Sequence, residues 1–299
     1  MRRKKFEELN VIDNFMFNEL AMQADEEKAK RFFSILLKNI LNKEIKSVTI
    51  IPQKIIQGRK MEYRGIQTDS YVEAYVYDEG EANIILPLQS GIYDIEPNTY
   101  EENAVEKRMR YYHALIDTKL LDAGVDYQSM KDVTLIMISN KDPFHHNRMV
   151  YTFETHCIEE PELKYNDGIR TIYLYTGGKK GTDNSELAKL LRFMEDSRRE
   201  NAVSPEMREI YDMMSEIKQN AEKGVRYMKS WEIEEMRYAQ GKQEGIKEGI
   251  KGTISTLLSF GHTEEEIKSA LIKQYNLSEK EAEECMAGAG ADGKGTGWI

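Results

Sequence analysis

Residues 91–139 read GIYDIEPNTYEENAVEKRMRYYHALIDTKLLDAGVDYQSMKDVTLIMIS, and this stretch decides the fold. It opens with a strand-like segment, Gly91–Glu96, and closes with Val133–Ser139, a nearly continuous apolar run typical of a buried strand. Between them, residues 103–121 place apolar and aromatic side chains at helical intervals, namely Val105, Met109, Tyr112, Ile116 and Leu120. Strand, helix and strand in succession predict a mixed α/β layer.

Outward from this stretch the same two patterns recur. On the N-terminal side, residues 28–42 show helical spacing, and strand-like segments follow at Ser47–Ile56 and Ile66–Tyr77. On the C-terminal side, two more strands are expected at Met149–His156 and Ile169–Thr176. The pattern therefore predicts an α/β core that covers roughly residues 1–180.

The C-terminal third is helical by pattern from Ser185 onward. Within it, GKQEGIKEGIKG at 241–252 has glycine at about every fourth position, which weakens a helix, so we expect a flexible or frayed linker there, with a close-packed helix–helix contact as the alternative. Thr263 and Ser278 precede acidic first turns and are the predicted N-caps of two short helices. The expected divisions are a core at 1–180, a helical extension at 181–240, a glycine-rich linker at 241–252, a small helical tail at 253–286 and a disordered low-complexity end at 287–299.

Composition excludes several classes of protein. The chain has 299 residues, of which 40% are hydrophobic, so it can bury a core without disulfides or metal staples. No apolar run approaches the roughly 20 residues that span a bilayer, and no apolar segment follows the basic N-terminus as in a signal peptide. The two cysteines, Cys157 and Cys285, stand in no metal-ligand spacing. We therefore expect a soluble cytoplasmic protein with no membrane partner.

Charge is distributed unevenly although the net charge is −10. Residues 65–104 hold nine acids and no lysine or arginine, whereas residues 41–60 and Lys107–Arg110 on either side are basic. An acidic patch between basic flanks suits a site that holds a divalent cation and meets phosphate. Ordinary surface scatter of charge is the alternative.

The candidates for a metal site are Asp69, Glu96 and Pro97. Asp94 and Glu96 share one face of the expected strand because side chains repeat every two residues. Asp69 stands on the preceding strand segment, where it could converge with Glu96 on one cation, and Pro97 offers a carbonyl oxygen. Carboxylates and carbonyls select Mg²⁺ or Mn²⁺, which can activate water for attack on a phosphate.

An ordered set of segments resembles the family of PD-(D/E)XK nuclease transposases, the Rpn-type recombination-promoting nucleases. The resemblance covers about residues 8–240. The matching pieces are ELNVIDNFMF at 8–17, VTIIPQKII at 48–56, GIQTDSYVE at 65–73, IYDIEPNTY at 92–100, EKRMRYYHALID at 106–117, GVDY at 124–127, DPFHHNRMVYTFETHC at 142–157, DGIRTIYLYT at 167–176 and SRRENA at 197–202.

The resemblance implies a restriction-endonuclease-like mixed sheet flanked by helices, with a helical C-terminal extension. It places the two metal-binding acids at Asp69 and Glu96. Asn98 falls where the family motif usually has lysine or glutamine, so an amide would have to position the attacking water. A cation from the following helix would then substitute for the lysine. Arg108, at the edge of the apolar stripe, is the first candidate and Lys107 the second, with a structural ion pair as the alternative role for Arg108.

The function predicted on these grounds is a Mg²⁺- or Mn²⁺-dependent DNA endonuclease associated with transposition or recombination. Because cutting both strands of DNA needs two sites, a homodimer is expected. A weakened relative that binds DNA or a protein without cutting is the alternative, and Asn98 favours it. Glycoside hydrolysis by a carboxylate pair is a distant third, because no run of aromatic sugar platforms accompanies the acids.

Overall fold

The computed structural model describes residues 4–51, 55–56, 66–67, 71–76, 89–99, 104–120, 124, 126–181 and 185–292. The chain divides into two compact units, Met1–Gly224 and Val225–Ile299. The elements in chain order are η1 (Phe6–Glu8), α1 (Asn14–Ala21), α2 (Glu26–Leu41), β1 (Ile45–Ile51), β2 (Ile55–Ile56), β3 (Ile66–Gln67), β4 (Tyr71–Val76), β5 (Gln89–Asn98), α3 (Val105–Leu120), η2 (Tyr127–Ser129), β6 (Asp132–Ser139), β7 (Val150–Glu154), β8 (Ile169–Tyr175), α4 (Glu186–Glu195), η3 (Arg199–Asn201), α5 (Pro205–Gln219), α6 (Ala221–Ser259), α7 (Glu264–Tyr275) and α8 (Glu279–Asp292).

The first unit is built on a six-stranded mixed sheet with the strand order β1-β4-β5-β6-β8-β7. The pairs β1/β4, β4/β5 and β7/β8 are antiparallel, whereas β5/β6 and β6/β8 are parallel. The parallel pair β5/β6 requires a crossover, and α3 supplies it. The strand–helix–strand stretch predicted from the sequence is thus the centre of the sheet, and the mixed α/β class is confirmed.

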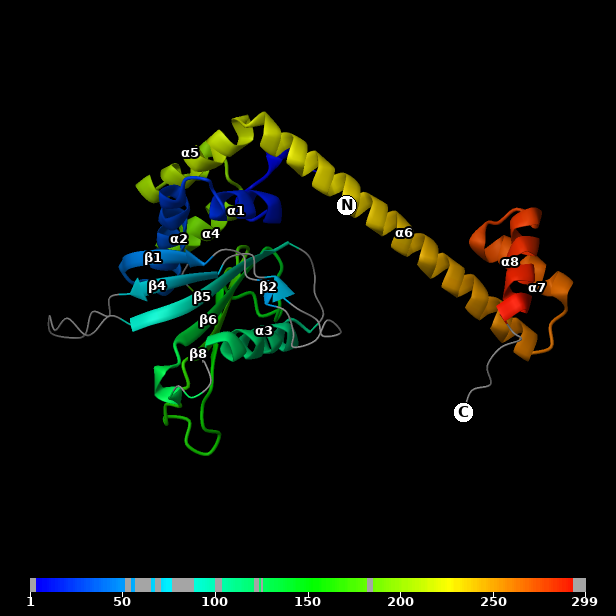
Figure 1. Cartoon of the computed structure of the whole chain (residues 1–299), viewed down its shortest axis with the longest axis horizontal. Helices are drawn as coiled ribbons and strands as arrows, with labels where there is room; N and C mark the ends of the chain where they lie inside the picture. The colour runs from blue at the N-terminus through cyan, green and yellow to red at the C-terminus, as the bar shows by residue number, and fades with distance from the viewer. Residues whose placement is uncertain are drawn as a thin grey trace. The chain divides into compact units, whose positions relative to one another are not determined.

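Helices cover both faces of the sheet (Figure 1). The face toward α3 carries a cluster that joins the strands to the helix, with Ile92, Leu135, Met137, Val105 and Met109 among its buried members. Central strand β6 is buried at every residue after Asp132, because both of its faces are covered. This explains why its sequence is a continuous apolar run rather than an alternating one.

The opposite face is covered by α1, α2, α4 and α5 (Figure 1). Helix α2 packs on β1 and contacts α4 and α5, while α1 contacts α2, α5 and β5. The helices α4 and α5 each bury an apolar stripe, which includes Leu190 and Leu191 on α4 and Ile210 and Met214 on α5. The first compact unit therefore extends to Gly224, and the helices expected as an extension after residue 180 belong to its core.

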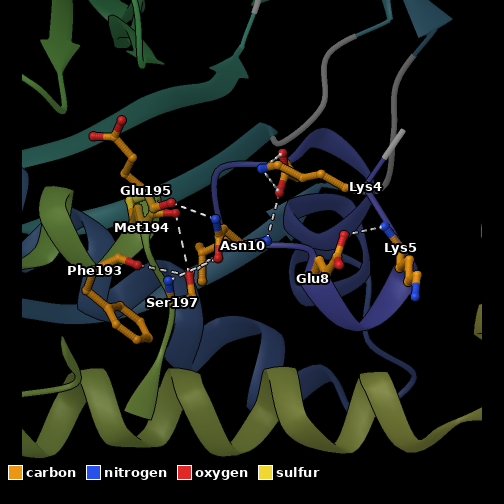
Figure 2. Close-up of polar contacts among 10 residues, drawn as sticks. Lys4, Lys5, Glu8, Asn10, Phe193, Met194, Glu195 and Ser197 are labelled. Carbon is orange, nitrogen blue, oxygen red and sulfur yellow. Dashed lines mark hydrogen bonds and ion pairs between the residues drawn. The ribbon is translucent and has the colours of Figure 1, made fainter. Parts of the chain in front are cut away.

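Polar contacts fasten the N-terminal segment to the end of α4 (Figure 2). The Asn10 side-chain amide donates to the Glu195 carbonyl at 2.6 Å, and the Ser197 N–H donates to the Asn10 side-chain oxygen at 3.1 Å. The Ser197 hydroxyl donates to the Phe193 carbonyl and accepts from the Val11 N–H, both at 2.9 Å. These contacts join segments about 185 positions apart, so they help to close the first unit.

In the second unit, the glycine repeat is helical, which corrects the expected flexible linker at 241–252. Helix α6 runs through the repeat without a break. The residues between the glycines are mostly lysine, glutamine and glutamate, which are good helix formers. The Gln240 side chain also donates to Glu244 at 3.1 Å, one turn further along the helix. These terms outweigh the helix-weakening effect of the four glycines.

The C-terminal end of α6 packs with α7 and α8 around a small core of Ile250, Ile254, Ile267, Leu271 and Ala282. Thr263 and Ser278 form capping boxes with Glu266 and Glu281, respectively, which confirms both predicted N-caps. Helix α8 continues to Asp292, so residues 287–292 are helical where disorder was expected, and residues 293–299 lie outside the described part. None of the helices among the described residues combines the length and apolarity needed to cross a membrane.

Candidate metal and phosphate site

The candidate site lies on the face of β5 that looks toward α3. Residues 94, 96 and 98 share this face with Ile92, a member of the cluster under α3. Asp94 is 1% exposed, Glu96 6% and Asn98 3%, so the face presents two buried carboxylates and a buried amide. Burying a charged group costs free energy unless the group is paired, so nearby cations would stabilise this face.

Arg108 supplies one such cation from the first turns of α3. Its guanidinium Nη2 lies 3.0 Å from the Glu96 carboxylate oxygen Oε2, and the two side chains are only 17% and 8% exposed. The same guanidinium lies over the ring of Tyr112, 5.5 Å from the centroid, which adds a cation–π contact. The ion pair and the ring together fix the side chain of Arg108 at the carboxylate face.

The predicted site residues are placed as follows. The structure brings Glu96 and Arg108 into contact. Lys107 is exposed to solvent, and its side chain makes no hydrogen bond or ion pair with the described residues. Of the two candidate cations, it is therefore Arg108 that lies at the site. Asp69 lies outside the described residues, so its expected convergence with Glu96 is not tested.

Asn98 and Pro97 form the end of β5. The Asn98 side-chain amide lies 3.9 Å from the Met137 sulfur of the neighbouring strand, a weak hydrogen bond. Pro97 pairs with Ile138 of β6 and is the penultimate residue of the strand, a position near the end where a missing N–H is tolerated. β5 thus extends two residues beyond the predicted strand, and the alternation of side chains places Asn98 on the same face as Asp94 and Glu96, with Pro97 on the opposite one.

Sequence reasoning placed Asp94 on the same face as Glu96 but gave it no role. Its near-complete burial makes it part of the site. The signal was available in the two-residue repeat of Asp94, Glu96 and Asn98, which puts three polar groups on one side of a strand. The alternation alone does not predict that this face of the strand is buried.

The donor set fits a hard divalent cation. Two carboxylates on one strand face are the oxygen ligands that Mg²⁺ and Mn²⁺ prefer. No cluster of three or more histidine, cysteine, aspartate or glutamate side chains with metal-binding geometry occurs among the described residues. A complete ligand set would therefore draw on a main-chain carbonyl or water, or on groups beyond the described residues, as Mg²⁺ sites commonly draw on waters and substrate phosphates.

Comparison of the chain with family models, with curated proteins and with solved structures found no match.

Proposed function

We propose that the protein is a Mg²⁺- or Mn²⁺-dependent endonuclease that hydrolyses phosphodiester bonds of DNA in transposition or recombination. The observation that carries the proposal is the pair of buried carboxylates, Asp94 and Glu96, on one face of β5 with the Arg108 guanidinium against Glu96. A site with carboxylates for a cation and a guanidinium for an anion suits a metal-assisted attack on phosphate. The choice of DNA as substrate rests on the resemblance of the ordered sequence segments.

In this proposal Glu96 and Asp69 hold the cation, with the Pro97 carbonyl as a further ligand. Asp94, one strand repeat before Glu96, adds a second negative group on the same face. A bound divalent cation would lower the pKa of a water molecule and offset the charge that builds on the phosphate. Without it, two ionised carboxylates would repel the phosphate, so binding of DNA at this site should depend on the metal.

Arg108 is the proposed phosphate ligand. A guanidinium presents five N–H donors in a rigid fork, so one arginine can hold a carboxylate and a phosphate oxygen together. Its contact with Glu96 would then place a scissile phosphate beside the metal ligands. Asn98 would orient the attacking water through its amide, and the exposed Lys107 would attract the DNA backbone from the rim.

The proposed reaction is hydrolysis. The water oxygen bonds to phosphorus as the bond from phosphorus to one deoxyribose oxygen breaks. One water proton is released to solvent, and the leaving oxygen gains a proton. Because a single site cuts one strand, double-strand cleavage would require a homodimer, for which the C-terminal helices are the proposed regulatory or oligomerising element.

A second candidate function is binding of DNA or of a protein without cleavage. The observation that favours it is that Glu96 already has a cationic partner in Arg108, while Asn98 replaces the family's usual lysine or glutamine. An ion pair of this kind can be purely structural, and an amide supplies no positive charge to the transition state. Phosphodiester turnover separates the two candidates, whereas metal binding does not.

The test is nicking of supercoiled plasmid by the full chain in Mg²⁺ and in Mn²⁺. We expect cleavage by the parent and a loss on the order of 100-fold in Glu96→Gln, at least the loss seen when metal sites lose supporting groups. Asp94→Asn and Asp69→Asn should be impaired as well. Glu209→Gln is the matched control, because Glu209 also pairs with an arginine, Arg31 at 2.6 Å, but belongs to α5 on the opposite face of the sheet.

Circular dichroism of each variant shows whether it is folded. A folded parent that leaves the plasmid intact, or Glu96→Gln that cuts as well as Glu209→Gln, would refute the endonuclease proposal. In that case, DNA binding by the folded parent without cutting would support the second candidate.

A further inference from the structure

A pocket of about 450 Å³ lies between α3 and the strands β7 and β8, and Glu96 is not among its lining residues. From α3 it is lined by Glu106, Arg110, His113 and Asp117, whose spacing of three and four places them along one side of the helix. Arg108 is not among the lining residues. The volume of the pocket falls within the range of volumes found for small-molecule binding sites.

Aromatic and aliphatic side chains from the sheet form the apolar wall of this pocket. Phe153 of β7 and Tyr173 of β8 meet edge to face, with ring centroids 5.6 Å apart, and Ile169 lies beside them. Phe153 is 48% exposed although its ring is apolar. Covering this ring with a flat apolar ligand would remove exposed hydrocarbon from water.

His113 and Thr171 form the polar part of the wall. The His113 Nε2 lies 2.9 Å from the Thr171 hydroxyl oxygen, and its buried Nδ1 has no hydrogen-bond partner among the described residues. Burial lowers the pKa of His113 to about 4, so the imidazole is neutral near pH 7. The histidine therefore adds no positive charge to the pocket, and its buried nitrogen would gain from a hydrogen-bond donor or acceptor.

The charges around the pocket are predominantly negative. Glu154 is balanced by Arg170 at 2.5 Å, which leaves Glu106 and Asp117 against Arg110 among the lining residues. Burial and the charge of the nearby Asp167 raise the pKa of Asp117, as expected where negative charge is in excess. A cation in the pocket would relieve this excess.

We propose that this pocket binds a small molecule that joins an aromatic ring to an ammonium group, with the ring against Phe153 and the ammonium at Asp117. The apolar wall accounts for the ring, and the unbalanced carboxylates account for the charge. The binding site does not depend on the carboxylate face of β5.

The test compares three probes of similar shape and different charge by calorimetry on the full chain at pH 7. The probes are 2-phenylethylammonium, the neutral 2-phenylethanol and the anionic 3-phenylpropionate. We expect the ammonium to bind about tenfold tighter than the alcohol, as one screened charge contact allows, and the carboxylate to bind most weakly. Asp117→Asn should reduce the affinity for the ammonium to that for the alcohol. Phe153→Ser should reduce the affinities for the ammonium and for the alcohol alike.

Glu162→Gln is the control, because Glu162 is an exposed acid in the loop between β7 and β8 and is outside the pocket. It should leave the affinity of the ammonium unchanged. The proposal is overturned if the folded parent binds no probe at millimolar concentration, if the alcohol binds as tightly as the ammonium, or if Asp117→Asn and Glu162→Gln have the same effect.

Discussion

The Arg108 guanidinium lies 3.0 Å from the Glu96 carboxylate, and both side chains are largely buried. Arg108 comes from the helix that crosses from β5 to β6, and Glu96 comes from the strand that this helix leaves. The contact therefore ties the crossover helix to the carboxylate face of the sheet. The two proposed roles of Arg108, as a phosphate ligand and as a member of a structural ion pair, both depend on its guanidinium group.

Loss of Arg108 should destabilise the first unit. Arg108→Ala leaves the Glu96 carboxylate buried without this cation, and we expect the free energy of unfolding to fall by about 3 kcal/mol, the range for breaking a buried pair. Urea unfolding followed by hydrogen exchange of the β5 and β6 amides, which belong to the first unit, measures the change. Lys107→Ala is the neighbouring control and should change stability by less than about 0.5 kcal/mol, because its side chain is exposed. Equal effects of the two substitutions would contradict a structural role for the pair.

Histidine 113 should make stability depend on pH. Its pKa is about 4 in the folded chain and ordinarily 6.5, so below pH 6.5 the unfolded chain takes up a proton that the folded chain does not. The contribution of neutral His113 to the free energy of unfolding is therefore complete above pH 6.5. It is lost as pH falls toward 4, by about 3 kcal/mol in total. The difference between parent and His113→Gln in urea unfolding at pH 4–7 measures it.

The exposed His146 provides the control for that experiment. His146→Gln should follow the parent at every pH, because the side chain of His146 is exposed and lies outside the pocket that holds His113. If the slope of stability against pH were the same in His113→Gln as in the parent, other groups would be responsible for it.

The glycine repeat allows a test of helix α6. No atom lies within 4 Å of a Cβ added at Gly245, whereas a Cβ at Gly249 would lie 3.1 Å from the Tyr275 hydroxyl, which bonds to Thr253. Gly245→Ala should therefore stabilise the helix by about 0.5–1 kcal/mol, and Gly249→Ala should gain less. Hydrogen exchange of the amides at 241–252, followed by mass spectrometry, should slow most in Gly245→Ala. If the amides at 241–252 exchange fast and neither alanine substitution slows them, the segment is a flexible linker and not a stable helix.

Much of the fold was predictable because local patterns and tertiary burial agree. The apolar run at Val133–Ser139 became β6, which is buried on both faces, and the stripe on residues 103–121 became α3. The prediction of which α3 residues are buried was less accurate. It included Tyr112, which is half-buried, and omitted His113, which is 6% exposed, because adjacent helix positions near the edge of a stripe differ by only 100°.

The candidate site was predictable in its residue types but not in its contacts. The alternation of Asp94, Glu96 and Asn98 gave a common face, and the stripe on α3 left Arg108 at its edge. That Arg108 reaches Glu96 depends on how α3 crosses the sheet, which spacing in the sequence does not encode. The pocket at His113 was not predicted, because it joins α3 to strands that begin 30 residues or more after the end of the helix.

Asn98 offers a gain-of-function test of the proposed chemistry. Its side chain lies on the carboxylate face, where a lysine would bring an ammonium toward Glu96 and a bound phosphate. We expect Asn98→Lys to raise the plasmid-nicking rate on the order of 100-fold, the scale on which one well-placed charge donor stabilises such a transition state. Single-turnover nicking in Mg²⁺ measures the rate.

Asn98→Met separates the charge of the new side chain from its length. Both substitutions lengthen a side chain that contacts Met137 and is 3% exposed, so any cost of packing should be similar in the two. Only lysine adds a positive charge, and the nearby Glu96 carboxylate partly offsets the cost of burying it. A rate increase in Asn98→Lys alone would show that the missing cation limits the reaction. Equal rates in folded Asn98→Lys, Asn98→Met and parent would mean that residue 98 does not act on the phosphate, and the water-positioning role of Asn98 would have to be abandoned.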